Sequence, residues 1–190
     1  MATQIRRVGF LADTHSRKND GSDVPEEVDR AFAGVDLIVH LGDVGKKAFI
    51  SRLQTLAPVW VPDDERKGYQ AFGSDEAAVK VVDVGGMQLG LAFNLAQPDK
   101  KITVGDDAII FPDGPIEALM NRRFKQPVDL VAFGGTHRQL RQDHDGIVFF
   151  NPGSPTLPAD KGDDADLGSV AVLDVAKGKA SIDLVRLRAT

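Results

Sequence analysis

Acidic and imidazole side chains stand directly after apolar runs at three separate places in the sequence. Asp13 and His15 follow one such run, Asp43 follows a second and His137 follows a third. Because ligand sites in α/β folds gather outside the carboxyl ends of strands, we expect these side chains to converge. A mixed set of carboxylates and imidazoles suits Mn, Fe or Zn better than Mg or Ca, which prefer oxygen ligands. The pattern therefore predicts a divalent metal site built from Asp13, His15, Asp43 and His137.

Each motif also has an ordinary structural interpretation when it is taken alone. A lone Asp-x-His is a weak signal, Asp43 can cap the helix that follows it, and His137 can be a loop residue. The occurrence of all three motifs after apolar strands favours the metal site over these interpretations.

The apolar runs predict the elements that must position these side chains. We expect strands at 8–11, 36–41, 58–61, 128–133 and 146–150, hairpins at 78–84 with 87–93 and at 169–175 with 180–187, helices at 25–32, 45–56 and 115–124, and an acidic loop at 157–168. The opening alternation of strands and helices indicates an α/β fold with parallel pairing. The second half is too rich in strands for a doubly wound sheet. We therefore expect two packed mixed β-sheets flanked by helices, as a single domain over residues 1–190.

Composition narrows the class of protein. The chain has 190 residues, with 23 Lys and Arg against 28 Asp and Glu, and this net charge of −5 argues against general nucleic-acid binding. The absence of cysteine excludes disulfides and thiolate metal sites. No apolar run approaches the roughly 20 residues of a membrane helix, and the N-terminal residues do not resemble a signal peptide. We expect a soluble cytoplasmic protein with no membrane partner.

Taken together, the motifs resemble those of the calcineurin-like metallophosphoesterases, in particular the small bacterial phosphodiesterase branch. The matching residues are Asp13-Thr14-His15, Gly42-Asp43, Gly134-Gly135-Thr136-His137 and Asn151-Pro152-Gly153-Ser154, in the order of the family. The resemblance implies two mixed β-sheets packed face to face and a first metal held by Asp13, His15, Asp43 and His137. It also implies a catalytic part for Asp43, the residue that bridges two metals in the family, and for His137.

The residues that hold the second metal of the family are largely replaced here. The Gly-Asn after the third strand reads Val61-Pro62-Asp63-Asp64, the isolated His is Asn94, and the first His of the last motif is Gly135. Asp63, Asp64 and Asn94 are the candidate substitutes, because carboxylate and amide oxygens bind hard divalent ions. Gly135 offers no side chain, so we expect either one or two bound ions.

Three functions follow from these observations. The intact first set favours a metal-dependent phosphoesterase acting on a phosphodiester or a small phosphate ester. The alternative is a catalytically silent family member that serves as a binding or scaffold module for a protein partner, which the residues Asn94 and Gly135 favour. A third interpretation is a one-metal hydrolase of a different bond.

Other polar residues near the motifs have simpler expected roles. We interpret His40, inside a strand, as structural, and His144, between two aspartates, as an exposed turn residue. The Asn151-Pro152-Gly153-Ser154 segment is expected to form a turn near the site. Four basic residues close to the motifs are interpreted as solvated loop charges, with binding of an anionic substrate as the alternative: Arg17, Lys18, Arg138 and Arg141.

Overall fold

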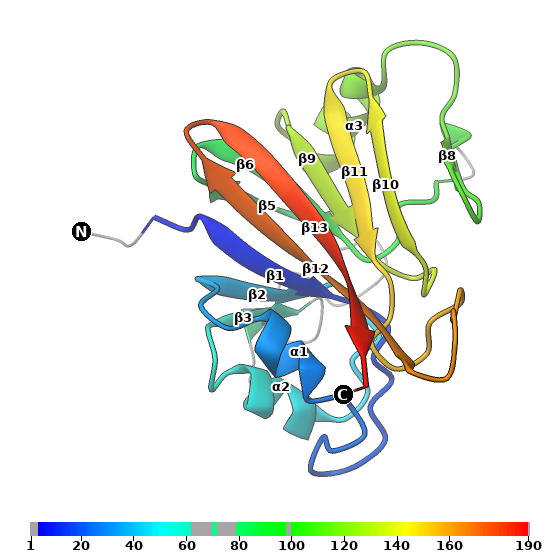
Figure 1. Cartoon of the computed structure of the whole chain (residues 1–190). Helices are drawn as coiled ribbons and strands as arrows, with labels where there is room; N and C mark the ends of the chain where they lie inside the picture. Colours follow the sequence, from blue (N-terminus) through cyan, green and yellow to red (C-terminus); the bar gives the residue numbers. More distant parts are fainter. Residues whose placement is uncertain (1–3, 62–69, 72–78, 98–99, 190) are drawn as a thin grey trace.

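Two stacked β-sheets dominate the computed structural model, which describes residues 4–61, 70–71, 79–97 and 100–189 (Figure 1). The first sheet runs, in spatial order, through β13 (Lys179–Arg188), β12 (Asp166–Ala176), β1 (Arg7–Leu11), β2 (Leu37–His40), β3 (Val59–Val61) and β4 (Gln70–Ala71). The second runs through β10 (Gln139–His144), β11 (Ile147–Pro152), β9 (Leu130–Phe133), β6 (Met87–Ala92) and β5 (Val79–Val84). A small separate pair is formed by β7 (Thr103–Val104) and β8 (Ile109–Ile110).

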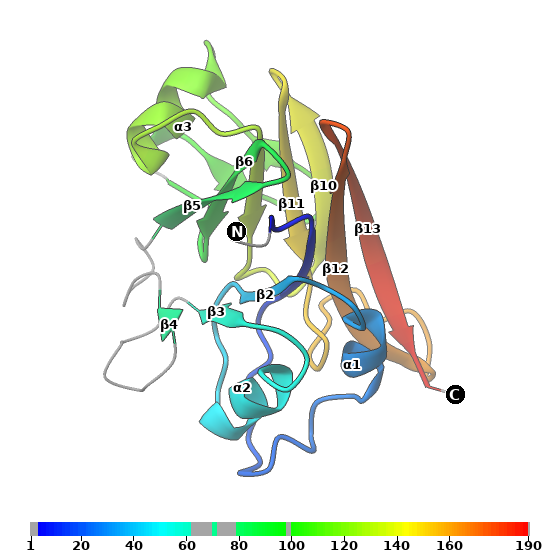
Figure 2. The same cartoon turned by 90° about the vertical axis from the view of Figure 1, so that its left-hand side faces the viewer.

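Short helices cover the outer faces of the two sheets. Helices α1 (Glu27–Ala31) and α2 (Lys47–Leu53) lie on the first sheet, and α3 (Ile116–Phe124) lies on the second (Figures 1 and 2). None of these described helices is long and apolar enough to cross a membrane. The arrangement confirms the predicted pair of mixed sheets flanked by helices.

The alternation of side chains along each strand divides the core into three apolar clusters. In β1, Val8 and Phe10 face the second sheet, whereas Leu11 faces the helices. The ring of Phe10 meets that of Phe150 edge to face across the two sheets, with ring centroids 5.0 Å apart. A third cluster lies between the second sheet and α3, and it includes the fully buried Phe133. Because β1, β2 and β9 are buried on both faces over nearly their whole length, the position of each strand in its sheet is closely fixed.

Parallel pairing brings several carboxyl ends of strands to one edge of the molecule. β1 pairs in parallel with β2, and β9 pairs in parallel with both β6 and β11. The ladder between β1 and β2 continues into the loops that follow, because Ser16 and Gly45 form an isolated parallel bridge. This continuation also explains why α2 begins at Lys47 rather than at residue 45 as predicted.

Strand β10 corrects two expectations. Its sequence, QLRQDH, is polar and does not predict a strand, yet it pairs along its whole length with β11. His144 was expected to be exposed in a turn, but it is the last residue of β10. Its half-buried ring stacks on Phe111 with centroids 4.4 Å apart. The predicted loop at 157–168 is also shorter than expected, because β12 begins at Asp166, opposite Arg188.

His40 has the structural role that was expected of it, because its ring links the loops that follow β1 and β2. Gly42 N–H donates to His40 Nδ1 at 3.2 Å, so the ring proton sits on Nε2, which lies 2.9 Å from Thr14 Oγ1. The Thr14 hydroxyl in turn donates to the carbonyl of Val44 at 2.7 Å. Complete burial, together with a smaller effect of the His15 charge, lowers the pKa of His40 to about 3. The ring is therefore neutral at physiological pH.

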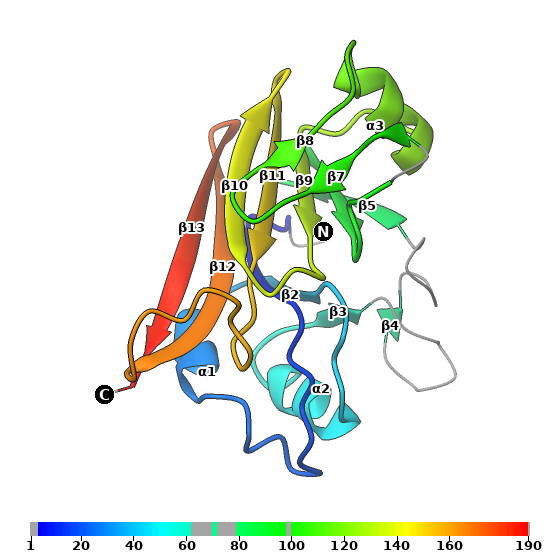
Figure 3. The same ribbon diagram turned by 90° about the vertical axis from the view of Figure 1, so that its right-hand side faces the viewer.

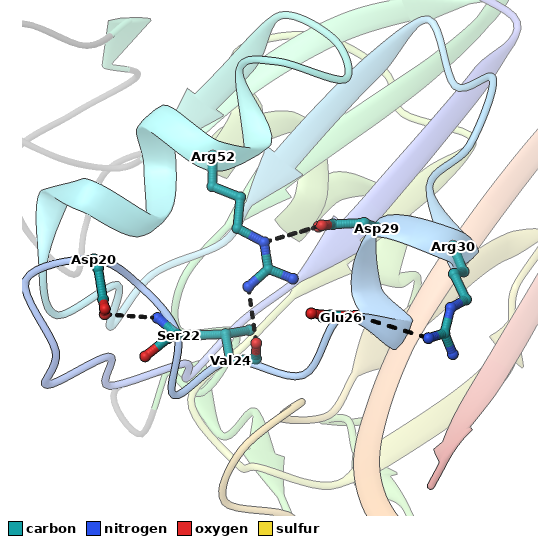
Figure 4. Close-up of a pocket in the computed structure, with 7 residues that line it drawn as sticks. All are labelled: Asp20, Ser22, Val24, Glu26, Asp29, Arg30 and Arg52. Carbon is teal, nitrogen blue, oxygen red and sulfur yellow. Dashed lines mark hydrogen bonds and ion pairs between the residues drawn. The ribbon is translucent and has the colours of Figure 1, made fainter. Parts of the chain in front are cut away.

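Arg52 fixes the loop between β1 and α1. This loop, α1 and α2 enclose a cavity of about 410 Å³, which Figure 4 shows with Arg52 at its centre. The Nε of Arg52 donates to Asp29 at 3.0 Å, and its two terminal nitrogens donate to the carbonyls of Gly21, Val24 and Pro25. One guanidinium thus orders the chain that follows Asp13 and His15.

Replacing Arg52 by Ala should destabilise the protein, because a carboxylate and three carbonyls lose their donor together. We expect the free energy of unfolding to fall by about 2 kcal/mol in urea unfolding. Arg30→Ala is the control, since Arg30 pairs with Glu26 and Glu27 on an exposed helix face and should cost less than about 0.5 kcal/mol. Equal losses in the two variants would contradict the role of Arg52.

The buried His40 should make stability depend on pH. Its pKa of about 3 in the folded protein lies below the ordinary 6.5, so the unfolded chain binds the proton more readily. The stability that the neutral His40 contributes is complete above pH 6.5 and decreases as the pH falls toward 3. At pH 5 the free energy of unfolding has fallen by roughly 2 kcal/mol. Urea unfolding at several pH values should show a smaller loss in His40→Gln than in the wild type, with His144→Gln as control. Parallel pH profiles for wild type and His40→Gln would refute this.

Candidate metal centre

The candidate ligands share an unusual backbone conformation. Asp13, His15, Asp43 and His137 have φ values of 53°, 42°, 53° and 59°, in the left-handed region that residues other than glycine rarely adopt. Each such residue costs on the order of 1 kcal/mol or more and persists only where its surroundings hold it. The conformation turns each side chain back over the end of its strand, toward a common point.

Backbone hydrogen bonds interlock the loops after β1 and β2. Asp13 N–H donates to the carbonyl of Gly42, and His15 N–H donates to the carbonyl of Asp43, both at 2.9 Å. At Gly42, where φ is 147°, an added Cβ would lie only 2.2 Å from the ring of Phe93. Glycine is therefore required for this loop to pass so close to the second sheet.

The turn after β11 anchors the same loops from the other side, near the site as expected. Ser154 Oγ donates to the carbonyl of Asp13 at 2.8 Å, and Thr156 Oγ1 donates to that of Thr14 at 2.7 Å. Asn151 Nδ2 donates to Thr136 Oγ1 at 3.1 Å, in the loop after β9. These side chains bring the strand ends of both sheets together.

Three of the four predicted ligands come together in one cluster. The ligand atoms of Asp13, His15 and His137 all lie within 4.8 Å of one another. The two imidazole Nε2 atoms are 3.4 Å apart, and His137 Nε2 lies 3.9 Å from Asp13 Oδ1. Asp43 lies outside this group of three, but its Oδ2 is 3.4 Å from His15 Nε2. Its side chain is 46% exposed, so it faces the solvent side of the cluster.

A backbone carbonyl fixes the orientation of His137. His137 Nδ1 lies 2.9 Å from the carbonyl oxygen of Leu157, which accepts hydrogen bonds only. Nδ1 therefore carries the proton, and the lone pair of Nε2 is directed toward Asp13 and His15. This is the arrangement typical of metal-binding histidines. The part played by Leu157 cannot be predicted from the sequence, because every residue type offers a backbone carbonyl.

The Asp13 carboxylate is buried and only partly satisfied. Its Oδ2 accepts hydrogen bonds from the backbone of Gly135 at 2.9 Å and of His137 at 3.4 Å. Its Oδ1 is buried and has no hydrogen-bond partner among the residues that the structure describes. Burial raises the pKa of Asp13, with a smaller contribution from the charge of Asp43, and prevails over the opposing effects of His137 and the backbone N–H groups.

These features fit a divalent cation. A buried carboxylate oxygen without a donor needs a positive charge nearby, and two imidazole nitrogens 3.4 Å apart do not both carry a proton toward each other. One cation in contact with both rings and with Asp13 Oδ1 satisfies all of these groups. The donor set of one carboxylate and two imidazoles, with Asp43 beside it, suits Zn, Mn or Fe.

The candidate substitutes for a second set of ligands are less well placed. Asn94 Oδ1 already accepts the backbone N–H of Ala96 at 2.9 Å. Gly135 has no side chain, and its backbone N–H serves Asp13 instead. Asp63 and Asp64 lie outside the described residues. Among the described candidates, none offers an uncommitted ligand atom beside the cluster.

Comparisons with known proteins agree with the geometry. The family model of the calcineurin-like phosphoesterase superfamily domain matches residues 7–178. A probable metallophosphoesterase of Methanothermobacter thermautotrophicus is 27% identical over 151 residues, which cover 80% of this chain and 78% of the relative. A probable metallophosphoesterase of Methanocaldococcus jannaschii is 30% identical over 151 residues, which cover 80% of this chain and 69% of the relative.

A solved structure supports the same fold. Vps29 from Entamoeba histolytica, crystallised as a complex with zinc, superposes with a TM-score of 0.59 at 21% sequence identity, covering 95% of this chain and 98% of its own. The sequence match spans most of the chain and includes every residue of the cluster. The chain therefore belongs to the calcineurin-like phosphoesterase superfamily, a family of metal-dependent phosphoesterases.

Proposed function

We propose that this protein is a phosphodiesterase that works with one divalent ion, held by Asp13, His15 and His137 with Asp43 beside them. The observation that carries the proposal is the buried Oδ1 of Asp13, which has no hydrogen-bond partner among the described residues and lies in one cluster with two imidazoles. Zinc is the preferred ion, because the donor set suits it and because a protein of the same fold was crystallised with zinc. Mn and Fe are the other candidates.

The proposed chemistry divides between the ion and the protein. A bound divalent ion supplies Lewis-acid polarisation of the phosphoryl oxygen and a water of lowered pKa. The exposed carboxylate of Asp43 stands at the solvent side of the cluster, where it orients the attacking water and accepts its proton. His137, fixed by the carbonyl of Leu157, keeps its Nε2 directed at the reacting centre. With a single ion neutralising charge, we expect turnover slower than that of two-metal enzymes.

The second candidate is a catalytically silent binding module. It is favoured by the replacements at the expected second site, since Gly135 has no side chain and Asn94 Oδ1 already accepts a hydrogen bond from Ala96. The likeness in fold to Vps29 is compatible with this alternative. In that case the ion would only tie the strand ends together, and a protein partner would replace the phosphate ester as the ligand.

The burial of Asp13 predicts opposite effects of one substitution without and with metal. In the metal-free protein at neutral pH, Asp13→Asn should raise the melting temperature, because the raised pKa of Asp13 means that its charged form costs stability. With zinc at one hundred times Kd, the wild type should gain about 2.7 kcal/mol while Asp13→Asn gains little. Calorimetry in EDTA and in zinc, with elemental analysis expected to give one ion per wild-type chain, measures both.

His144→Ala is the matched control for these measurements, because His144 lies outside the cluster. It should bind zinc as the wild type does. A lower melting temperature of Asp13→Asn in EDTA, or equal zinc stabilisation of the two proteins, would count against the proposed site. Two ions per wild-type chain would show that a second site has been rebuilt, with Asp63 and Asp64 as the first residues to test.

The hydrolytic activity itself is tested with bis(p-nitrophenyl) phosphate and the zinc- or manganese-loaded full chain. We expect slow turnover that His137→Ala removes and that Asp43→Asn lowers about a hundredfold in kcat, because a general base is lost. His144→Ala should retain the wild-type rate. No turnover of diesters or monoesters by the loaded wild type would favour the binding module. Turnover of a carboxylic ester alone would favour hydrolysis of a different bond.

A further inference from the structure

A segment that precedes α3 lies along one face of β10. Residues 100–115 include the β7–β8 hairpin, which in Figure 3 reaches across β10. The amide of Gln142 pairs with both backbone groups of Ile109, at 2.7 and 2.9 Å, and the ring of His144 stacks on Phe111. Because these contacts come from alternate residues of β10, the hairpin follows one face of the strand toward the loop that holds His137.

Arg138 connects this face to the candidate metal centre along the chain, because it lies between the candidate ligand His137 and the first residue of β10. It directly follows His137, and its side chain is only 27% exposed. Its charge partner is Asp106, in the turn of the hairpin, with Arg138 Nη2 3.7 Å from Asp106 Oδ1. Among the residues that the structure describes, the guanidinium makes no hydrogen bond within 3.5 Å. Its N–H donors are therefore largely unused in a partly buried position.

Such a group is prepared to bind an anion. A guanidinium has five N–H donors that match the oxygens of a phosphate, and half-burial strengthens the attraction. The existing pair with Asp106 is weak, because Asp106 is 83% exposed and the two charged groups are beyond hydrogen-bond distance. An incoming phosphate is able to displace the Asp106 carboxylate.

Arg141 provides an internal comparison. It lies within β10, on the face opposite to Gln142 and His144, whereas Arg138 precedes the strand, which begins at Gln139. Its side chain is 46% exposed and pairs with Asp143 at 3.5 Å. Gln139, also on that opposite face, donates to the carbonyls of Val170 and Val185. The contact with Asp106 in the hairpin thus separates Arg138 from Arg141, which the sequence alone treats alike.

We propose that Arg138 binds a nonbridging oxygen of the substrate phosphate, and that Asp106 competes with the phosphate for its guanidinium. This inference rests on the proposed function, because it places the phosphate at the candidate metal centre. A single divalent ion leaves more of the phosphoryl charge to be neutralised than two ions would, and the guanidinium beside His137 supplies a further positive charge. Asp106 then favours release of the anionic product.

The two halves of this proposal predict opposite changes in affinity. Titration calorimetry of the zinc-loaded full chain with inorganic phosphate should show Kd about tenfold higher in Arg138→Ala, because a charge-assisted hydrogen bond is lost. Asp106→Asn should lower Kd severalfold, since its competing charge is removed. Arg138→Lys should give an intermediate Kd, and Arg141→Ala should match the wild type. In kinetics with bis(p-nitrophenyl) phosphate, Arg138→Ala should raise KM more than it lowers kcat.

The zinc content of each variant separates the possible outcomes. If the wild type binds zinc and phosphate but Arg138→Ala binds phosphate equally well, the inference is overturned while the proposed function stands. The inference also falls if Arg138→Ala and Asp106→Asn change Kd in the same direction, because the pair then only holds the hairpin in place. A wild type that takes up no zinc overturns the proposed function itself.

Discussion

The carboxylate of Asp13 is buried at the point where the strand ends of both sheets meet, and the surrounding loops are arranged to keep it there. Its backbone N–H is bonded to Gly42, its carbonyl to Ser154 and its side chain to Gly135. One residue thereby receives contacts from the loops that follow β2, β9 and β11. Among the described residues, Oδ1 of this carboxylate has no hydrogen-bond partner, a condition that a cation satisfies.

Holding that charge in place carries a conformational cost that the rest of the fold offsets. The candidate ligand residues have left-handed backbone conformations, and burial favours the uncharged form of Asp13. The neutral His40 and the Thr14 hydroxyl stiffen the loops from beneath, and Arg52 orders the following segment. These hydrogen bonds, none of which involves a candidate ligand side chain, thus offset the free energy that the strained backbone and the buried charge cost.

The sequence predicted the layers well because apolar periodicity determines which faces are buried. It also predicted that Asp13, His15 and His137 lie close together, which they do, because side chains that follow strand ends gather at one edge of the molecule. It did not predict β10, whose polar residues are explained by the hairpin that covers them.

The parts of the site that the sequence missed have a common origin. Leu157 acts through its backbone carbonyl, so its role does not depend on the type of its side chain. Arg138 and Arg141 cannot be told apart from the sequence, and only their surroundings distinguish them, with Asp106 beside one and Asp143 beside the other. The backbone N–H of Ala96 donates to Asn94 Oδ1 and so competes with an ion for this oxygen. This local hydrogen bond likewise cannot be predicted from the composition.

The order of strands in the first sheet has a consequence for biosynthesis. β1 lies between β2 and β12, so one of its edges is paired only with residues 166–176. While the chain emerges from the ribosome, that edge stays open through most of translation and offers unpaired backbone groups to other chains. Asp13 likewise lacks its contact with His137 until the chain has grown by a further 124 residues. The cluster of Asp13, His15 and His137 is therefore complete only after His137 has been synthesised.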